Sequence, residues 1–282
     1  MTQDFGGEWT REKLQVLKIY SALYTRALKK GTSFRLHCID AFAGTGEVNI
    51  KTSTKKTREN IEGSMEILRK HGFDTFHFIE LDEDKAKILG EKIAKSNIKD
   101  KSTIYTGDAN QVIPKILANF NNQRDRVLLF LDPWGLAVEM DTLVKISRKP
   151  ICDVIYLFPS SIILRAIPHK SEGRLQVKMK GKALQCFGMT EKELTDLVYK
   201  ESPQTDMFKQ RSIERDANID KIEKILIAKL KEKAGFAYVH PTPKRLLKGA
   251  KGPVLFSLIF CASNPSKNAI TLIRKFATYS FQ

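Results

Sequence analysis

Apolar residues along the chain alternate between short continuous runs and longer segments with helical spacing. The most apolar run, 126–131, carries five apolar residues in a row and ends at Asp132. Such a run is typical of a strand buried on both faces of a parallel sheet. Further strand-like runs lie at 35–39, 75–81, 103–106 and 153–158, and segments of helical periodicity separate them. This alternation predicts strands joined by crossover helices.

The last part of the chain predicts a different pairing. Two strands are expected at 236–240 and 254–261, joined by a basic turn, so that they form an antiparallel pair. Helices are expected at 9–30, with Thr10 as the N-cap, and at 84–98, 112–120, 219–233 and 268–276. We therefore predict an α/β fold: one doubly wound, Rossmann-like domain over 1–282, with about seven strands, the last one antiparallel. The basic segment at about 163–215 is expected to be a helical insertion or lid.

The charge balance points to an anionic partner. The 282 residues include 48 Lys and Arg against 32 Asp and Glu, a formal net charge of +16. The basic residues are partly clustered, at 50–60 and at 165–182, so we expect nucleic acid, DNA or RNA, as a partner. A generally basic surface without such a partner is the alternative interpretation.

Neither a membrane nor a metal is expected. We find no signal peptide and no apolar run long enough to cross a membrane. The four cysteines are widely spaced and form no CxxC pair, so neither zinc nor a disulfide framework is predicted. These features are typical of a reduced, cytoplasmic protein.

The stretch CIDAFAGTG, 38–46, carries the first candidate chemistry. A buried strand ends at Asp40, and Phe42, Gly44 and Gly46 follow in a tight loop where nucleotide-like cofactors bind in doubly wound sheets. Asn49 stands where the dinucleotide fingerprint needs a third glycine, and no P-loop lysine follows. The loop therefore suits S-adenosylmethionine better than NAD or ATP. Taken alone, it is equally compatible with a simple turn.

The ends of the other strands add polar groups to the same expected crevice. Glu80 ends the second strand, where an acid accepts hydrogen bonds from ribose hydroxyls. Asp108 follows the third strand and is expected to bind the adenine amino group, although capping of the next helix is an alternative. Ser64 is expected either as a helix N-cap or as a hydroxyl facing the cofactor. Asp132, Pro133 and Trp134 follow the fourth strand.

This combination of motifs resembles the three-Cys-motif partner family of Rossmann-fold, methyltransferase-like proteins. The resemblance spans nearly the whole chain and rests on the Lys13/Leu17/Tyr20 opening, IDAFAGTG, Gly63-Ser64, FIELD at 78–82, GDAN, LDPWG, Phe158-Pro159, Phe187-Gly188 and 256–263. FAGTG and DPWG also look like motifs of adenine-N6 methyltransferases that act on ribosomal RNA or DNA. The resemblance implies a protein partner encoded nearby, as in phage-defence systems. It also implies S-adenosylmethionine contacts from a set of loop and strand-end residues, namely Asp40, Phe42, Gly44, Gly46, Glu80 and Asp108.

The same resemblance implies that Asp132, Pro133 and Trp134 form the catalytic pocket for the methyl acceptor. An exocyclic amine is a poor nucleophile because its lone pair is delocalised into the ring. A carboxylate and a backbone carbonyl that accept its two N–H groups would favour methyl transfer, and Trp134 would stack on a flipped base. The chain departs from the usual amino-methyltransferase motif, because a second proline is missing. A helix-capping role for Asp132 is the alternative.

Two main hypotheses for function follow. The first is an S-adenosylmethionine-dependent methyltransferase that acts on an exocyclic amine of a nucleic-acid base. The second is a catalytically silent module that binds cofactor and nucleic acid and regulates a partner. A protein or small-molecule methyltransferase is a third possibility, which predicts weak, salt-insensitive binding of nucleic acid. The sequence leaves the oligomeric state open.

Overall fold

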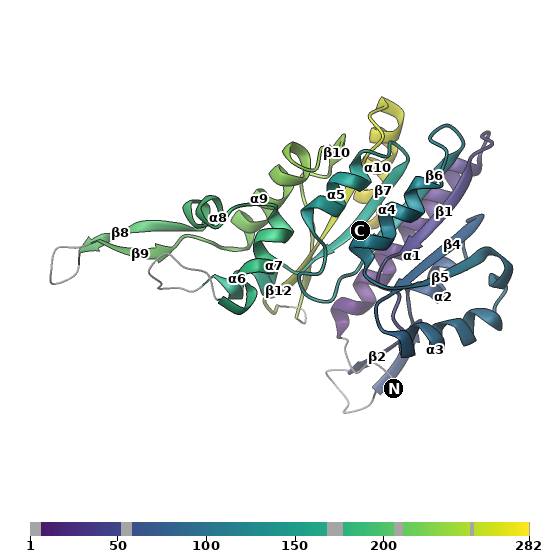
Figure 1. Ribbon diagram of the computed structural model, residues 1–282, viewed down its shortest axis with the longest axis horizontal. Coiled ribbons are helices and arrows are strands. Elements are labelled where there is room, and N and C mark those ends of the chain that lie inside the picture. The colour runs from purple at the N-terminus through teal and green to yellow at the C-terminus, as the bar shows by residue number, and fades with distance from the viewer. Residues whose placement is uncertain (1–6, 52–57, 168–176, 206–210, 249–250, 282) are drawn as a thin grey trace.

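The structure, a computed structural model, describes residues 7–51, 58–167, 177–205, 211–248 and 251–281. Its centre is an 8-stranded sheet in which seven strands follow the order β10-β12-β7-β6-β1-β4-β5, and β11 also pairs with β12 (Figure 1). The parallel strands are β1 (Arg35–Asp40), β4 (Thr75–Glu80), β5 (Ser102–Thr106), β6 (Asp125–Leu131) and β7 (Cys152–Phe158). The last strand, β12 (Val254–Ala262), runs antiparallel to β7, as the sequence predicts.

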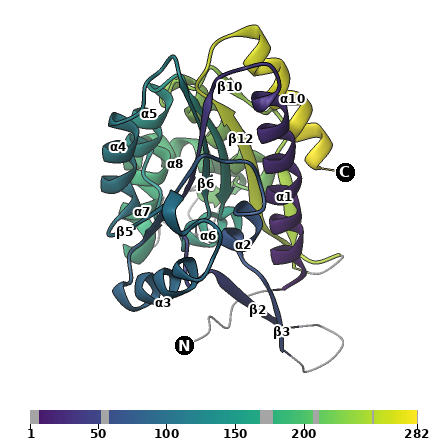
Figure 2. The same ribbon diagram turned by 90° about the vertical axis from the view of Figure 1, so that its right-hand side faces the viewer.

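Helices cover both faces of this sheet (Figure 2). Helices α1 (Glu8–Lys29), α2 (Ser64–Leu68), α3 (Glu83–Ala94) and α10 (Lys267–Ser280) pack on one face. The other face carries α4 (Ala109–Ala118), α5 (Met140–Ser147), α6 (Ser160–Ala166), α7 (Val177–Phe187), α8 (Glu191–Val198) and α9 (Ile219–Glu232). Between α3 and β5 lies a short 3-10 helix, η1 (Lys99–Lys101). The chain therefore folds as a doubly wound α/β structure with three layers.

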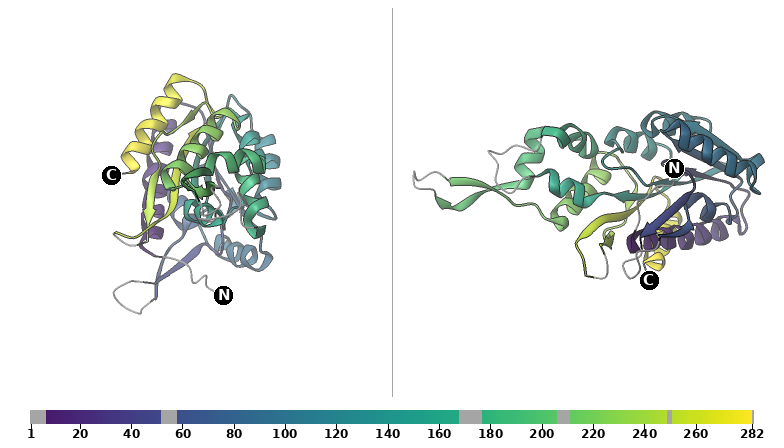
Figure 3. Two further views of the ribbon diagram at one scale, coloured as in Figure 1. Left: turned by 90° about the vertical axis from the view of Figure 1, so that its left-hand side faces the viewer. Right: turned by 90° about the horizontal axis from the view of Figure 1, so that it is seen from below.

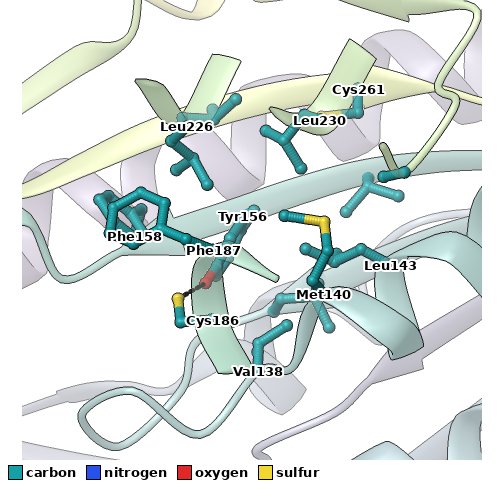
Figure 4. Packing of buried hydrophobic residues seen from close by; sticks show 14 of the residues in the cluster. Val138, Met140, Leu143, Tyr156, Phe158, Cys186, Phe187, Leu226, Leu230 and Cys261 are labelled. Carbon is teal, nitrogen blue, oxygen red and sulfur yellow. Dashed lines mark hydrogen bonds between the residues drawn. The ribbon is translucent and has the colours of Figure 1, made fainter. Parts of the chain in front are cut away.

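Successive residues of each central strand enter opposite cores because side chains alternate along a strand. In β6, Leu128 and Phe130 pack under α1 and α10, whereas Leu129 and Leu131 pack under the opposite helices. Figure 4 shows part of the second core, where Tyr156 of β7 lies among Met140, Phe187 and other apolar side chains, and its hydroxyl lies 3.7 Å from the Sγ of Cys186. Both faces of the strand are thus buried, as its continuous apolar pattern predicts.

The chain reverses its direction across the sheet between β1 and β6. From β1 it moves outward through β4 to β5, and it then returns to β6 on the other side of β1. Ligands of doubly wound sheets bind outside the carboxyl ends of the strands at such a switch point. Asp40 at the end of β1 and Asp132 just after β6 both lie there.

Two β-ribbons extend from this carboxyl edge, and the sequence pattern did not predict either of them (Figures 1 and 3). The first pairs β2 (Glu47–Lys51) with β3 (Arg58–Glu62), in the region where the sequence analysis identified only a cluster of basic residues at 50–60. The second joins β8 (Tyr199–Thr205) to β9 (Arg211–Arg215). The described part of the expected insertion at 163–215 therefore contains α7 and α8 and, after them, the β8–β9 ribbon, so it is not helical throughout. Lys55 and Lys56 of the basic cluster at 50–60 lie outside the described residues, as do residues 168–176 of the basic segment.

Several predicted boundaries are also corrected. Helix α1 starts from Gly7, and Thr10 lies inside it with its Oγ1 accepting a hydrogen bond from the Gly7 N–H at 3.3 Å. Strand β10 (Tyr238–Val239) is shorter than expected, and β11 (Lys244–Leu247) occupies part of the predicted basic turn. Helix α5 has no counterpart in the sequence prediction. Within the described ranges, no helix has the length and apolar character needed to cross a bilayer.

Candidate functional site

The glycine loop after β1 requires glycine at the positions that the sequence singles out. Gly44 has φ of 60° and Gly46 has φ of 76°, a left-handed conformation that side chains with a Cβ rarely adopt. The backbone N–H groups of Ala41 and Ala43 donate to Phe130 and Ile79, so the loop is anchored to the two neighbouring strands. The loop therefore turns sharply at the switch point and leaves backbone groups at its rim.

Gly63 adds a close backbone approach that sequence reasoning missed. A Cβ at Gly63 would lie 2.5 Å from the carbonyl oxygen of Gly46, well inside van der Waals contact. Gly63 directly precedes α2, so the glycine loop and the start of this helix pack backbone to backbone. The Gly63-Ser64 pair was noted in the sequence, but the contact between Gly63 and Gly46 is visible only in the fold.

Asp40 is fully buried below this loop. Its Oδ2 accepts a hydrogen bond of 2.5 Å from the Ser64 hydroxyl, and its Oδ1 a long one of 3.4 Å from the Phe42 N–H. Burial, together with the nearby Asp132 carboxylate, raises the pKa of Asp40 to about 7, whereas the Ser64 hydrogen bond and the Lys13 ammonium lower it. Ser64 is the first residue of α2 and Gly63 its N-cap, so the predicted capping role of Ser64 is wrong.

Asp132 forms an ion pair with α1 and does not cap a helix. The Nζ of Lys13 lies 2.5 Å from Oδ2 of Asp132, and the two side chains are 8% and 24% exposed. The next helix, α5, begins after Glu139, so the alternative interpretation of Asp132 as its cap is wrong. Asp132, Asp40, Ser64 and Lys13 thus form one polar cluster at the switch point.

Lys13 is a site residue that the sequence analysis named only in the Lys13/Leu17/Tyr20 opening of the resemblance, without a role in the site. It lies on the buried face of α1, four residues before Leu17 and seven before Tyr20, both of which are fully buried. Its ammonium also lies 5.3 Å from the centre of the Trp9 ring. A lysine within an otherwise apolar stripe was the available signal, since an isolated charge is costly to bury without a partner.

Glu80 links the end of β4 to the glycine loop. Its Oε2 accepts a hydrogen bond of 2.8 Å from the Gly44 N–H, and its Oε1 one of 3.0 Å from the Asp82 N–H. A carboxylate has further lone pairs, so these bonds fix its orientation and still leave acceptor capacity. Phe42, by contrast, packs its half-buried ring against the core under α4 to α9.

Asp108 caps α4, as the alternative interpretation held, and its side chain is exposed. Its Oδ1 accepts from the N–H of Asn110 at 2.9 Å. The Asn110 side chain in turn donates to the Ala137 carbonyl at 2.8 Å and accepts from the Thr142 hydroxyl at 2.8 Å. Asn110 therefore links the loop after β5 to the segment that follows Asp132. The sequence analysis named this asparagine only as part of the GDAN motif.

The two residues after Asp132 differ in exposure. Pro133 is buried, whereas the Trp134 side chain is 68% exposed, an unusual fraction for a large aromatic residue. Gly135 follows with φ of 66°, which turns the chain toward α5. An exposed indole offers an aromatic face on which a planar ligand can stack.

A concavity of about 740 Å³ lies away from this cluster, between α9, β10 and α10. It is lined by Lys231, Tyr238, His240 and Arg274 among others. Because Tyr238 aligns with Ala262 of β12, and Ala262 with Asp153 of β7, this hollow lies toward the amino ends of the parallel strands. None of the predicted site residues lines it.

Comparison with known proteins finds solved structures of similar fold but no matching family. No family model matches the chain, and no curated protein matches it. Similar solved structures include a Legionella pneumophila protein, at 12% identity and TM-score 0.48, covering 95% of this chain and 92% of that one. An S-adenosylmethionine-dependent methyltransferase from Clostridium acetobutylicum has 13% identity and TM-score 0.38, over 87% and 90% of the two chains. The DszA carbon methyltransferase has 12% identity and TM-score 0.43, over 86% and 51%. Similarities at this level assign no residue role and no substrate.

Proposed function

We propose that the protein is an S-adenosylmethionine-dependent methyltransferase that acts on an exocyclic amine of a nucleic-acid base. The observation that carries the proposal is the cluster at the switch point. There the glycine loop, the buried Asp40 and the Asp132 carboxylate lie at adjacent strand ends. Asp132 already accepts a hydrogen bond from an amine, that of Lys13, which is the kind of contact that the acceptor would make.

The residues present fit the cofactor. The left-handed turn at Gly44 and Gly46 brings backbone close to the switch point without a side chain in the way. Glu80 would accept the ribose hydroxyls, and Asp108 the adenine amino group. When bound, the cofactor would supply a methyl group on a positively charged sulfur, a strong electrophile.

The chain's own residues would prepare the acceptor amine. The Asp132 carboxylate and the carbonyl of Asp132 or Pro133 would accept its two N–H groups, which localises the lone pair on nitrogen. Trp134 would stack on the base and offset part of the few kcal/mol that base extrusion costs. The net charge of +16 favours an anionic substrate, and nucleic acid meets that requirement.

A silent binding module is the second candidate, and a specific observation favours it. The oxygen Oδ2 of Asp132 is already engaged by Lys13, so the carboxylate has a structural partner without any substrate. In this case Asp132→Ala would leave biological activity unchanged, whereas catalysis requires that it be lost while cofactor and nucleic acid still bind. Association with a protein partner encoded nearby, as in phage defence, belongs to this proposal.

Calorimetric titration with S-adenosylmethionine, for the wild type beside Gly44→Val, tests the proposed cofactor site. A valine at φ of 60° is strained and blocks the backbone approach, so we expect micromolar binding by the wild type and its loss in the variant. Transfer of a radiolabelled methyl group to DNA and RNA follows. A folded wild type that binds no cofactor would overturn the methyltransferase proposal.

A further inference from the structure

Lys13 and Asp132 form an ion pair that joins α1 to the end of β6, across a sequence separation of 119 residues. The Lys13 side chain is only 8% exposed, and its ammonium contacts the Asp132 carboxylate and lies 5.3 Å from the centre of the Trp9 ring. Asp40 lies close enough that its ionisation responds both to Asp132 and to Lys13. Asp40 and Asp132 therefore lie near the same cation, and of the two Asp132 contacts it directly.

We propose that Lys13 is a positioning residue for Asp132, and that the ion pair sets the charge of the crevice that receives the cofactor. The proposal rests on the proposed function, because it assigns a role within the same site. Lys13 holds Oδ2, so the carboxylate is fixed in one orientation and Oδ1 remains to accept an N–H group.

Three ionisable side chains set the net charge of this cluster. With both carboxylates ionised, Asp40 and Asp132 carry two negative charges against one positive charge on Lys13. A cationic sulfonium compensates the remaining negative charge, whereas the thioether of the demethylated product cannot. In a buried site such a difference is weakly screened by solvent and salt. With both carboxylates ionised, the cluster of Asp40, Asp132 and Lys13 would therefore favour the substrate form of the cofactor over the product form.

The coupling can be measured without any cofactor, by NMR titration of the Asp40 side-chain carboxyl. Lys13→Met removes a charge that lowers the pKa of Asp40, so its midpoint is expected to rise from about 7 by about 0.5 or more. Asp132→Asn removes a charge that raises it, so the midpoint is expected to fall.

Lys29→Met supplies the matched control for this titration. Lys29 lies on the same helix and pairs with Asp74 at 2.7 Å, but both side chains are about 40% exposed, at 42% and 40%. This variant is expected to leave the Asp40 midpoint unchanged. Equal midpoints in the wild type, Lys13→Met and Asp132→Asn would overturn the proposed coupling.

Calorimetry with S-adenosylmethionine and S-adenosylhomocysteine tests the selectivity, because the two ligands differ only in the methylsulfonium group. At pH 8.5, Lys13→Met is expected to raise the preference for the sulfonium by about threefold or more, and Asp132→Asn to lower it. Lys13→Arg, which keeps the charge, is expected to stay within about twofold of the wild type.

The two proposals fail in different ways. If Lys13 has only a structural role, Lys13→Met would weaken the binding of both ligands equally and leave the preference between them unchanged. That result would overturn the inference. If neither ligand binds the wild type, the proposed cofactor site is wrong, and the Asp40 titration still decides whether Lys13 and Asp132 act on Asp40. If Lys13→Met does not fold, the other two variants still test the inference. Lys13→Arg is expected to leave the preference for the sulfonium ligand unchanged, and Asp132→Asn is expected to lower it.

Discussion

At the scale of single residues, Asp40 couples the fold to pH. Burial raises its pKa from the usual 3.8 to about 7, so the folded protein keeps a proton that the unfolded chain releases. Stability from this group is complete below about pH 4 and decreases as the pH rises toward 7, because the unfolded state then binds fewer protons. Above pH 7 the contribution stays constant at its lowest level.

Replacing Asp40 by asparagine should remove this dependence. We expect the free energy of unfolding of the wild type, measured relative to Asp40→Asn, to fall by about 2–3 kcal/mol between pH 5 and pH 8. Urea denaturation of both proteins at several pH values measures the difference. Asp153, whose pKa burial also raises to about 7, is present in both proteins and cancels. Parallel stability curves would contradict the prediction.

Gly63 tests whether the glycine loop depends on its neighbour. A methyl group at this position would lie 2.5 Å from the Gly46 carbonyl oxygen, and backbone cannot move aside as a flexible side chain can. Gly63→Ala is therefore expected to lower the free energy of unfolding by about 1–3 kcal/mol. Gly72→Ala, where a Cβ would have no atom within 4 Å, is the control and should change it by less than about 0.5 kcal/mol. Denaturation curves that coincide for the two variants would rule out the close approach.

At the scale of elements, a buried polar network joins α9 to the last strands of the sheet. The Glu223 carboxylate accepts hydrogen bonds from Arg245 of β11 and from the Ser257 hydroxyl of β12, the latter at 2.5 Å. Ser257 also contacts the hydroxyl of Ser160, at the start of α6. Glu223 is 3% exposed, so these partners take the place of water around its carboxylate.

Truncation of Glu223 should therefore loosen the packing of α9. Glu223→Ala leaves the buried Ser257 hydroxyl without this acceptor, whereas Arg245 is 40% exposed and keeps Asp220, so the expected cost is about 1–3 kcal/mol in unfolding free energy. The surface carboxylate of Asp216, which pairs with Lys200 and Lys221 at 2.9 and 2.8 Å, offers a contrast. Asp216→Asn should leave the denaturation midpoint nearly unchanged. Equal midpoints for both variants would show that the network contributes little.

At the scale of the whole molecule, the net charge of +16 makes a prediction for nucleic-acid binding. Lysines and arginines that contact phosphates release counterions, so affinity should fall steeply as salt increases. We expect a plot of log K against log salt with a slope of about −3 or steeper, measured by fluorescence anisotropy on a labelled oligonucleotide. Asp132→Ala, which removes the proposed N–H acceptor, should keep this slope while methyl transfer is lost. Salt-insensitive binding would favour a protein or small-molecule substrate.

Much of the architecture was predictable from local patterns. The continuous apolar run ending at Asp132 could only be a strand buried on both faces, and the order of strands and helices predicted a doubly wound sheet. The ribbons were not predictable in this way, because the sequences of β2, β3, β8 and β9 are short and mix charged, polar and apolar residues. Short strands with mixed composition give no periodic signal.

The sequence by itself determined the chemistry available at each strand end: an acid after β1, two glycines in the next loop, an acid after β4, and Asp132 with Trp134 after β6. Only the tertiary structure decided which of these groups meet. Asp132 faces Lys13, and Gly63 faces Gly46, because crossover connections bring distant segments together at the switch point. Local patterns record propensity and burial, whereas the partner of a buried charge depends on contacts between segments that no local pattern contains.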